Sequence, residues 1–386
     1  MQSFSVAWAE EDVARVLDRV ASVRLPMSPE GAGWSLGCDV DFLERMRRHW
    51  LDRYDWRAAV ERLNAWPQFI AEIEGLPIHF TKVEGEGARR PLLLTHGWPG
   101  SHYEFYGIVE ALAFPSRSGG SPDDAFDLII PSLPGYGFSG KPTQPIGQRE
   151  TARLWNMLMT EVLGYPHYLA QGGDWGSIVT SWLGVDHRAS VRAIHLNMLP
   201  FRSTEPPRDE AEAAWMQQAA MNQGMYGAYA GLQMTKPQSL AMATADDPLG
   251  QAAWIVERFH DWADLAGREV DDVFGMDHLL TNIMIYVMTG SFASSLWYYN
   301  GLIREGIGGL SSQRCKTPTA YAAFPGDALL PPPLRARAEL SYAIDRWTPM
   351  PRGGHFAAME EPALFVDDVR DWARDAWGRS CPPSGS

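Results

Sequence analysis

The sequence has 386 residues, of which 45% are hydrophobic and 21% charged, so it is long enough for a globular core with one or two additions. Its net charge of −14 argues against nucleic acid or an anionic membrane as a partner. No stretch approaches the roughly 20 apolar residues of a membrane span, and the first 21 residues lack the apolar centre of a signal peptide.

The three cysteines, Cys38, Cys315 and Cys381, lie far apart in the sequence and show no paired spacing. We interpret them as free thiols in a reducing compartment, and neither as nucleophiles nor as metal ligands. The expected location is therefore the cytoplasm.

Residues 1–85 are predicted to form a mainly helical N-terminal extension. Segment 40–50 places Phe42, Met46 and Trp50 on one side of a helix. Segment 75–80 is predicted to be a first strand. This extension could also serve a homodimer.

Between residues 86 and 200 the pattern changes to short apolar strands that alternate with helices, which predicts a mainly parallel sheet. The predicted strands are 91–95, 128–132, 168–170 and 191–196. Residues 201–314 interrupt this alternation with helical segments rich in methionine and aromatic residues, and we predict a cap over the sheet. The core resumes over 315–386, with strands at 319–324 and 341–347 and a last helix at 362–377. The predicted fold class is therefore α/β.

Segment 171–180, QGGDWGSIVT, joins a predicted strand directly to a predicted helix. Small residues flank Asp174 on both sides, as the close approach of strand and helix at such a turn requires. The pattern is that of the nucleophile elbow of the α/β-hydrolase fold, with Asp in place of Ser. A nucleophilic carboxylate would form an ester intermediate. Alone, the same pattern also fits an ordinary turn or a helix N-cap.

His355 lies between the last predicted strand and the last predicted helix, behind two glycines. This position fits the base of a hydrolase triad, whose chain order is nucleophile, acid, base. Asp327 is the first carboxylate after the preceding strand and is the predicted acid, which would fix the His tautomer. Asp345 is the rival. A structural histidine and a Pro-Gly-Asp turn are the plain alternatives.

Segment 96–101, HGWPGS, follows the first long apolar strand of the predicted core. In this fold the backbone at that position turns beside the elbow. The amides of Trp98 and Trp175 are therefore predicted to form an oxyanion hole.

With these segments the chain resembles the microsomal-type epoxide hydrolases, including the juvenile-hormone epoxide hydrolases and their soluble bacterial relatives. The resemblance covers nearly the whole chain. The segments that carry it are 55–57 (DWR) with Asn64, 75–80 (GLPIHF), 96–101 (HGWPGS), 131–139 (PSLPGYGFS), 171–176 (QGGDWG), 235–237 (TKP), 289–291 (TGS) and 352–358 (RGGHFAA). It implies an α/β-hydrolase core, a helical cap and an N-terminal extension wrapped on both.

The resemblance also implies two cap tyrosines that hold the epoxide oxygen, at Tyr229 and Tyr299, with Tyr226 and Tyr298 close enough to be their rivals. A phenol suits this role because it can both hydrogen-bond the oxygen and protonate the alkoxide. We expect the protein to lack the membrane anchor of the animal enzymes and therefore to be soluble, and it carries Asp327 where some relatives carry Glu.

The resulting hypothesis is an epoxide hydrolase that forms a covalent ester at Asp174 and releases a vicinal diol. Its partners would be a small-molecule epoxide and water, with no metal or organic cofactor. The Trp-, Met- and Tyr-rich cap and elbow favour an apolar or aryl epoxide. Some bacterial relatives serve natural-product pathways, so a biosynthetic role stands beside detoxification. Activity is expected to fall as pH drops through about 6.5, the ordinary pKa of a histidine.

Two other functions fit part of this pattern. A haloalkane dehalogenase shares the Asp nucleophile and would use Trp175 as a halide donor, but would not need two tyrosines. A catalytically inactive binding protein with a hydrolase fold should have lost part of the triad. A serine esterase is disfavoured because the predicted elbow carries Asp174 where a serine hydrolase carries its nucleophilic Ser.

Overall fold

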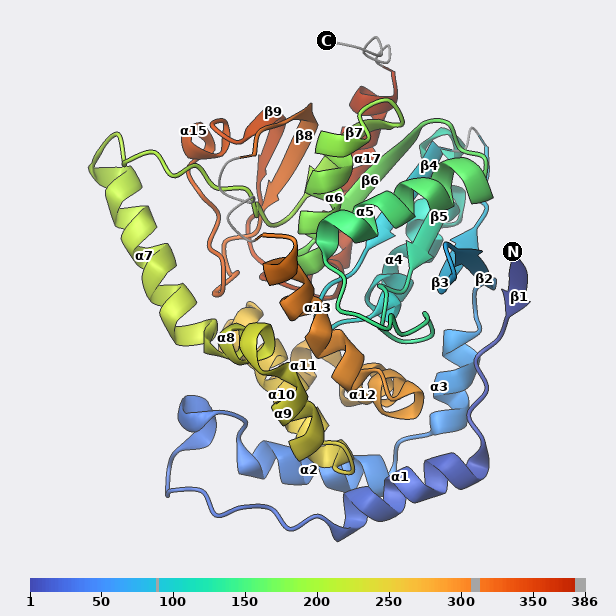
Figure 1. The fold of residues 1–386 in the computed structure, drawn as a ribbon, viewed down its shortest axis with the longest axis vertical. Coiled ribbons are helices and arrows are strands. Elements are labelled where there is room, and N and C mark those ends of the chain that lie inside the picture. Colours follow the sequence, from blue (N-terminus) through green and yellow to red (C-terminus); the bar gives the residue numbers. More distant parts are fainter. Residues whose placement is uncertain (88–89, 307–312, 379–386) are drawn as a thin grey trace.

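The computed structural model describes residues 1–87, 90–306 and 313–378. The end of the predicted cap at 307–312, and Cys381 in the last predicted segment, lie outside these ranges. Figure 1 shows two layers of different character, a sheet with flanking helices above and a group of helices below.

The central element is a nine-stranded sheet with the order β1-β2-β3-β5-β4-β6-β7-β8-β9. The strands from β4 to β9 pair in parallel, whereas β1, β2 and β3 are antiparallel and extend one edge. The strand bounds are β1 Gln2–Phe4, β2 Gln68–Ile73, β3 Leu76–Val83, β4 Arg90–Thr95, β5 Phe126–Pro131, β6 Tyr168–Gly172, β7 Val191–Leu196, β8 Cys315–Ala323 and β9 Tyr342–Pro349. The predicted α/β fold with a mainly parallel sheet is confirmed.

Two of these strands, β1 and β2, are absent from the sequence prediction, which made the extension helical apart from segment 75–80. Strand β1 has only three residues, too few for a periodic signal. Strand β2 turns into β3 through Glu74 and Gly75, which have φ of 51° and 78°. Two successive positive φ values make a tight hairpin turn. The pair Glu-Gly predicts such a turn less clearly than Asn-Gly would.

Helices cover both faces of the sheet. Helices α4 (Tyr106–Ala113) and α17 (Pro362–Trp377) pack on one face, where apolar side chains from the sheet and both helices form one core cluster. Helices α5 (Gln148–Met157) and α6 (Asp174–Asp186) lie on the other face, and their core cluster continues into the lower helical layer. The elbow is thus backed by buried structure on both sides.

In the lower layer, below the sheet in Figure 1, the described residues between β7 and β8 form seven helices. Their bounds are α7 Glu210–Tyr226, α8 Ala228–Thr235, α9 Pro237–Ala243, α10 Pro248–Trp262, α11 Val270–Phe274, α12 Met276–Thr289 and α13 Phe292–Arg304. Helix α13 packs along α8 and α9, and α10 packs against α12. These helices cover the edge of the sheet at which the parallel strands end.

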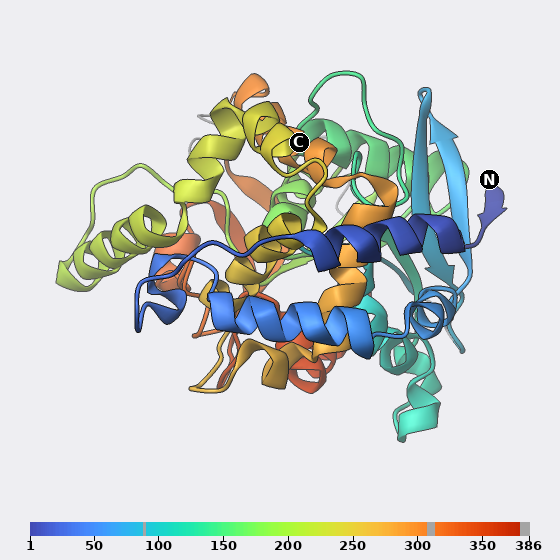
Figure 2. The ribbon, with the colours of Figure 1, turned by 90° about the horizontal axis from the view of Figure 1, so that it is seen from below.

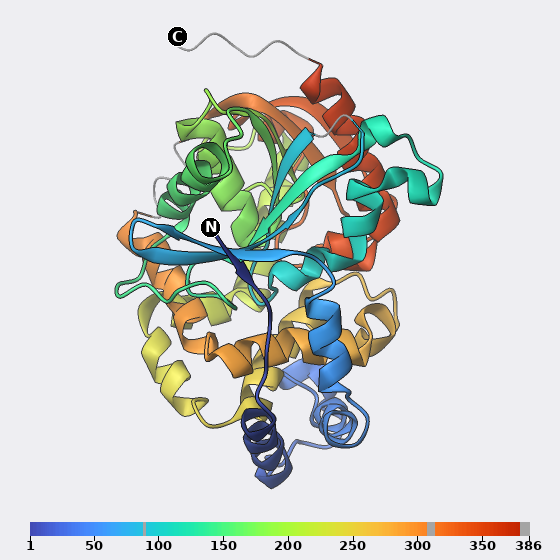
Figure 3. The ribbon, with the colours of Figure 1, turned by 90° about the vertical axis from the view of Figure 1, so that its right-hand side faces the viewer.

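The N-terminal helices α1 (Glu10–Ser22) and α2 (Val40–Asp52) run side by side beneath the cap, as Figure 2 shows. The ring of Trp34 stacks on that of His260 in α10, with centroids 4.0 Å apart. The hydroxyl of Tyr54 lies 3.1 Å from that of Thr281 in α12. Figure 3 shows how the chain then rises from these helices into β2 and β3. One segment thus joins the cap to the sheet.

Within the described ranges no helix taken singly has both the length and the apolarity to cross a bilayer. Helices α12 and α13 reach that combination only together, across a bend of 88°.

Candidate active site

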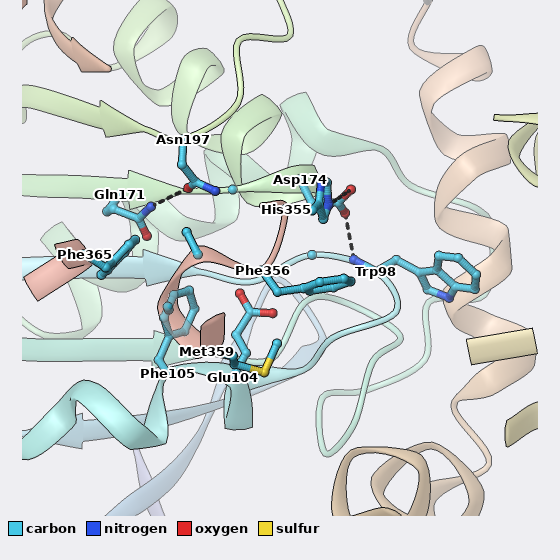
Figure 4. A pocket seen from close by; sticks show the side chains of 14 residues that line it. Trp98, Glu104, Phe105, Gln171, Asp174, Asn197, His355, Phe356, Met359 and Phe365 are labelled. Atoms are coloured by element: carbon cyan, nitrogen blue, oxygen red, sulfur yellow. Dashed lines mark hydrogen bonds and ion pairs between the residues drawn. The ribbon is translucent and has the colours of Figure 1, made fainter. Parts of the chain in front are cut away.

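The predicted site residues meet at the carboxyl ends of the parallel strands, the edge at which open α/β sheets bind ligands. Trp98 follows β4, Asp174 follows β6, Asp327 follows β8 and His355 follows β9. Figure 4 shows three of them, Trp98, Asp174 and His355, around one pocket.

Asp174 occupies the turn between β6 and α6 in a conformation that non-glycine residues rarely adopt, with φ of 47°. The strand and the helix approach so closely that a Cβ at Gly172 would overlap the backbone carbonyl of Gly176, and a Cβ at Gly176 would overlap that of Thr95 in β4. This is the reason for the small residues around the elbow. The strained turn directs the carboxylate of Asp174 away from the sheet and into the pocket.

His355 lies between two carboxylates. Its Nε2 is 3.2 Å from Oδ2 of Asp174, and its Nδ1 is 3.1 Å from Oδ2 of Asp327. The other oxygen of Asp327 accepts the amide N–H of Leu330 at 3.0 Å, which fixes that carboxylate. The rival Asp345 lies in β9 with its side chain exposed.

The second oxygen of Asp174, Oδ1, accepts the backbone N–H of Trp98 at 2.8 Å (Figure 4). A Cβ at Gly97 would overlap the Asp174 side chain, so the glycine of the HG pair leaves room for the carboxylate. The Trp175 amide lies in the first turn of α6, next to Asp174 in the chain. Its part in an oxyanion hole stays a prediction.

The negative charges of the two carboxylates change the expected pKa of His355. Burial alone would lower its pKa, but Asp327 and Asp174 together raise it well above its usual value. The two carboxylates therefore favour the protonated imidazole in the free enzyme, and a protonated His355 would form an ion pair with Asp174. The pH dependence of activity expected from the sequence assumed the ordinary pKa of a histidine, whereas the two carboxylates raise the pKa of His355 in this state. That dependence stays a prediction.

The loop that carries His355 is held by a carboxylate that the sequence analysis did not identify. Glu360 accepts the amide N–H groups of Asp264 at 2.7 Å, Gly354 at 2.8 Å and Phe356 at 2.7 Å. The donors flank His355 on both sides and include one from the loop after α10. Glu360 thus ties the position of the imidazole to the cap.

Two tyrosines of the cap face each other across the site. The hydroxyl oxygens of Tyr299 in α13 and Tyr229 in α8 are 3.4 Å apart. Tyr298 instead donates its hydroxyl to Thr151 at 2.8 Å, so it points into the α5 side of the core. Tyr226 is half-buried at the end of α7.

Burial raises the pKa of Tyr299 well above 10, and neighbouring Tyr229 and Asp174 raise it further. Burial likewise raises the pKa of Tyr229, with a further contribution from Asp174. Both phenols therefore keep their protons at neutral pH and can donate to an oxygen placed between them.

Aromatic rings surround these hydroxyl groups. Trp98 stacks on Tyr229 with centroids 5.2 Å apart and planes 10° apart, and Tyr299 meets Trp175 edge-on at 4.4 Å. Trp262 packs against both Tyr229 and His355, at 5.1 and 5.0 Å. A site lined in this way suits an apolar or aromatic molecule with one polar atom.

Several residues in or next to the site were absent from the sequence analysis. Trp262 ends a cap helix far along the chain, and nothing in the local pattern distinguishes it from a core tryptophan. Glu104 and Glu360 each follow a predicted motif within a few residues, and a carboxylate close to HG or GGH was the available signal.

The two described cysteines lie outside this site. Cys315 is buried and Cys38 half-buried, and burial raises the pKa of the first to about 11 and of the second to about 12. Such thiols are poor nucleophiles. Within the described ranges no group of His, Cys, Asp and Glu side chains has the arrangement of a metal site.

Comparisons with known proteins agree with this geometry. Residues 1–105 match the family model described as epoxide hydrolase N terminus, and residues 90–264 match the model described as alpha/beta hydrolase fold. The structure of juvenile hormone epoxide hydrolase from the silkworm Bombyx mori superposes with a TM-score of 0.89 at 27% identity, covering 97% of this chain and 94% of that one. Aspergillus niger epoxide hydrolase gives a TM-score of 0.84 at 29% identity, covering 97% and 96%.

Proteins that are similar in sequence are named epoxide hydrolases. A Stigmatella aurantiaca protein named "Putative epoxide hydrolase" is 38% identical over 379 residues, covering 96% of this chain and 84% of that protein. Epoxide hydrolase 1 of Oryctolagus cuniculus is 34% identical over 402 residues, covering 96% and 88%. The chain, with its aspartate elbow, triad geometry and paired cap tyrosines, therefore belongs to the epoxide hydrolase family of the α/β-hydrolase fold.

Proposed function

We propose that this epoxide hydrolase works through an ester at Asp174. The observation that supports the proposal is that the two oxygens of this carboxylate have different partners. Oδ1 accepts the Trp98 amide, and Oδ2 faces His355. Oδ2 is then free to attack an epoxide carbon from the side opposite the C–O bond, while Oδ1 stays in its hydrogen bond.

The ring oxygen leaves toward the phenols of Tyr229 and Tyr299, one of which protonates it. Protonated His355 supplies the proton that restores the phenol, so the imidazole is neutral when the ester has formed. In this order of steps the proton that the ring oxygen takes up comes from His355, without an outside donor. The steps use the raised pKa of His355 in the free enzyme.

In the second step water attacks the carboxyl carbon of Asp174, not the substrate. Neutral His355, oriented by Asp327, takes a proton from this water and delivers it to the departing diol oxygen. The developing oxyanion is stabilised by the Trp98 amide, with the Trp175 amide as its expected second donor. Ionisation of the regenerated carboxyl group returns a proton to His355 and closes the cycle.

The substrate class that we propose is an apolar or aryl epoxide. The stacked Trp98 and Tyr229, and the edge-on pair of Trp175 and Tyr299, offer aromatic surface on both sides of the two hydroxyl groups. An aryl group that stacks there would place the epoxide oxygen near the phenols. This chemistry serves a biosynthetic step or detoxification equally well.

Haloalkane dehalogenation is the rival that shares the nucleophile. The membership of this chain among the epoxide hydrolases disfavours it, as does the pair of phenols, since a departing halide needs no proton. Halide release from a haloalkane with no diol from styrene oxide would favour the rival. Binding of an epoxide without turnover would favour an inactive binding protein.

The test is a single turnover of excess enzyme with styrene oxide in H₂¹⁸O. The ester route transfers an oxygen of Asp174 to the diol, so the first diol should carry no label. The label should instead appear in the peptide that contains Asp174. Full labelling of the first diol would show direct attack by water and contradict the proposal.

A further inference from the structure

The mechanism above leaves one carboxyl group of the site unused. Glu104 lies in a short helix, η2 (His102–Phe105), a few residues beyond the HG turn. It lines the same small cavity as Asp174 and His355. Figure 4 shows its carboxyl group pointing into this cavity, across from the side chains of Asp174 and His355.

The local backbone makes room for this carboxyl group. A Cβ at Gly100 would overlap a carboxyl oxygen of Glu104. Burial raises the pKa of Glu104 well above its usual value, the charge of Asp174 raises it further, and His355 opposes the rise. Burial and the charge of Asp174 thus favour the neutral carboxyl group, which can donate as well as accept a hydrogen bond.

The cavity has the size and polarity for a water molecule. It leaves about 20 Å³ for the centre of a water, and roughly 10–15 Å³ is enough to hold one that has two to four polar partners. Asp174, His355 and Glu104 all line this cavity and carry polar atoms that can serve as those partners.

We propose that Glu104 binds the water that hydrolyses the Asp174 ester and orients it between His355 and the carboxyl carbon. The inference rests on the proposed function, because only an ester at Asp174 needs this water. The water oxygen bonds to the carboxyl carbon, and His355 takes one of its protons. The ester C–O bond then breaks, and the diol oxygen takes that proton from His355. The other water proton leaves as Asp174 ionises, so Glu104 ends the cycle unchanged.

Formation of the ester also changes the environment of Glu104. Esterified Asp174 has no negative charge, so one of the two causes that hold Glu104 neutral disappears. Burial, the larger cause of the raised pKa, remains in this state and still favours the neutral carboxyl group, which can both donate a hydrogen bond to the water and accept one from it. Glu104 is therefore expected to act in the second step, in which a water has to be oriented.

The test separates the two steps in a Glu104→Gln variant, which keeps the size of the side chain and loses its acid. Styrene oxide is mixed with excess enzyme, and ester and diol are followed by rapid quench and intact mass. We expect ester formation within about 2-fold of the parent and ester hydrolysis slower by about 10-fold or more, because a misplaced water reacts poorly. Glu110→Gln, on the exposed face of α4, is the matched control and should behave as the parent.

Hydrolysis at the parental rate in Glu104→Gln would overturn the inference, and so would an equal loss in both steps, which indicates a structural role. If this variant does not fold, Gly100→Ala displaces the Glu104 carboxyl group without removing it and should slow hydrolysis alone. Unchanged hydrolysis in Gly100→Ala would then reject the inference. Absence of the ester from the parent and from His355→Gln would instead refute the proposed function itself, and this inference with it.

Discussion

His355 lies 3.2 Å from one oxygen of Asp174, while the backbone amide of Trp98 holds the other oxygen at 2.8 Å. The two oxygens therefore have different environments before any substrate arrives. Oδ1 accepts a hydrogen bond from a backbone amide, which keeps its proton during the reaction. Oδ2 faces the imidazole of His355, which can release its proton. This asymmetry allows one carboxylate to serve as nucleophile first and as electrophile afterwards.

Removal of either cap phenol should slow ester formation and leave ester hydrolysis unchanged. Tyr229→Phe and Tyr299→Phe each remove a donor to the ring oxygen, and general acid catalysis contributes about 10²-fold or more. We expect a loss of that order in single-turnover alkylation by either variant. Tyr298→Phe is the matched control, because its hydroxyl bonds Thr151 and should affect stability by only about 1 kcal/mol. A slow Tyr298→Phe beside a normal Tyr299→Phe would reverse the assignment.

Asp327→Asn should affect the second step more than the first. The amide cannot stabilise the imidazolium and favours the wrong tautomer of His355, so hydrolysis should slow by about 10²-fold or more and the ester should accumulate. Intact mass during turnover measures this accumulation. The exposed Asp345 offers a control, since Asp345→Asn should leave both steps unchanged. Equal activity of Asp327→Asn and the parent would exclude Asp327 as the acid.

The pKa of His355 should fall when the charge of Asp174 is removed. Asp174 and Asp327 raise this pKa against the effect of burial, so Asp174→Asn removes one of its two anionic partners. NMR titration of the imidazole should show a higher pKa in the parent than in Asp174→Asn. Because the folded-state pKa lies above the unfolded value, the ion pairs stabilise the fold fully below about pH 6.5 and less as pH rises through the raised pKa. Identical pKa values in the two proteins would show that the pair does not form.

The sequence alone was enough to predict the turns of the candidate site, because neighbouring residues in the chain define each turn. A strand that turns into a helix around Asp174 requires small neighbours, and a HG turn and a GGH turn both follow strands. The paired tyrosines came from resemblance, because only tertiary structure shows that Tyr298 bonds Thr151 while Tyr299 meets Tyr229. The raised pKa of His355 was likewise beyond the sequence, since it depends on charges brought together by three separate loops.

Acid should destabilise the fold through histidines that are buried in neutral form. Burial lowers the pKa of His79 to about 3 and of His96 to about 4. Nε2 of His96 accepts the amide N–H of Leu133 at 3.1 Å, which requires the unprotonated ring. Both groups contribute stability above the unfolded value of about 6.5, and this contribution is lost as pH falls toward 4.

The free energy of unfolding should therefore drop below pH 6.5, by up to about 1.4 kcal/mol per pH unit for each group. Urea unfolding between pH 7.5 and 5 measures the slope, and His79→Gln should make it shallower. A stability that does not change over this range would contradict the burial of neutral histidines.

The central claim is that a carboxylate at the elbow becomes esterified and is then freed by water under the control of His355. Intact masses of Asp174→Asn and His355→Gln, each mixed separately with an aryl epoxide, test it most directly. We predict that the His355→Gln protein gains the mass of one epoxide, because its ester forms and is not hydrolysed, and that Asp174→Asn gains none. Unchanged masses with full diol production by both variants would contradict the account.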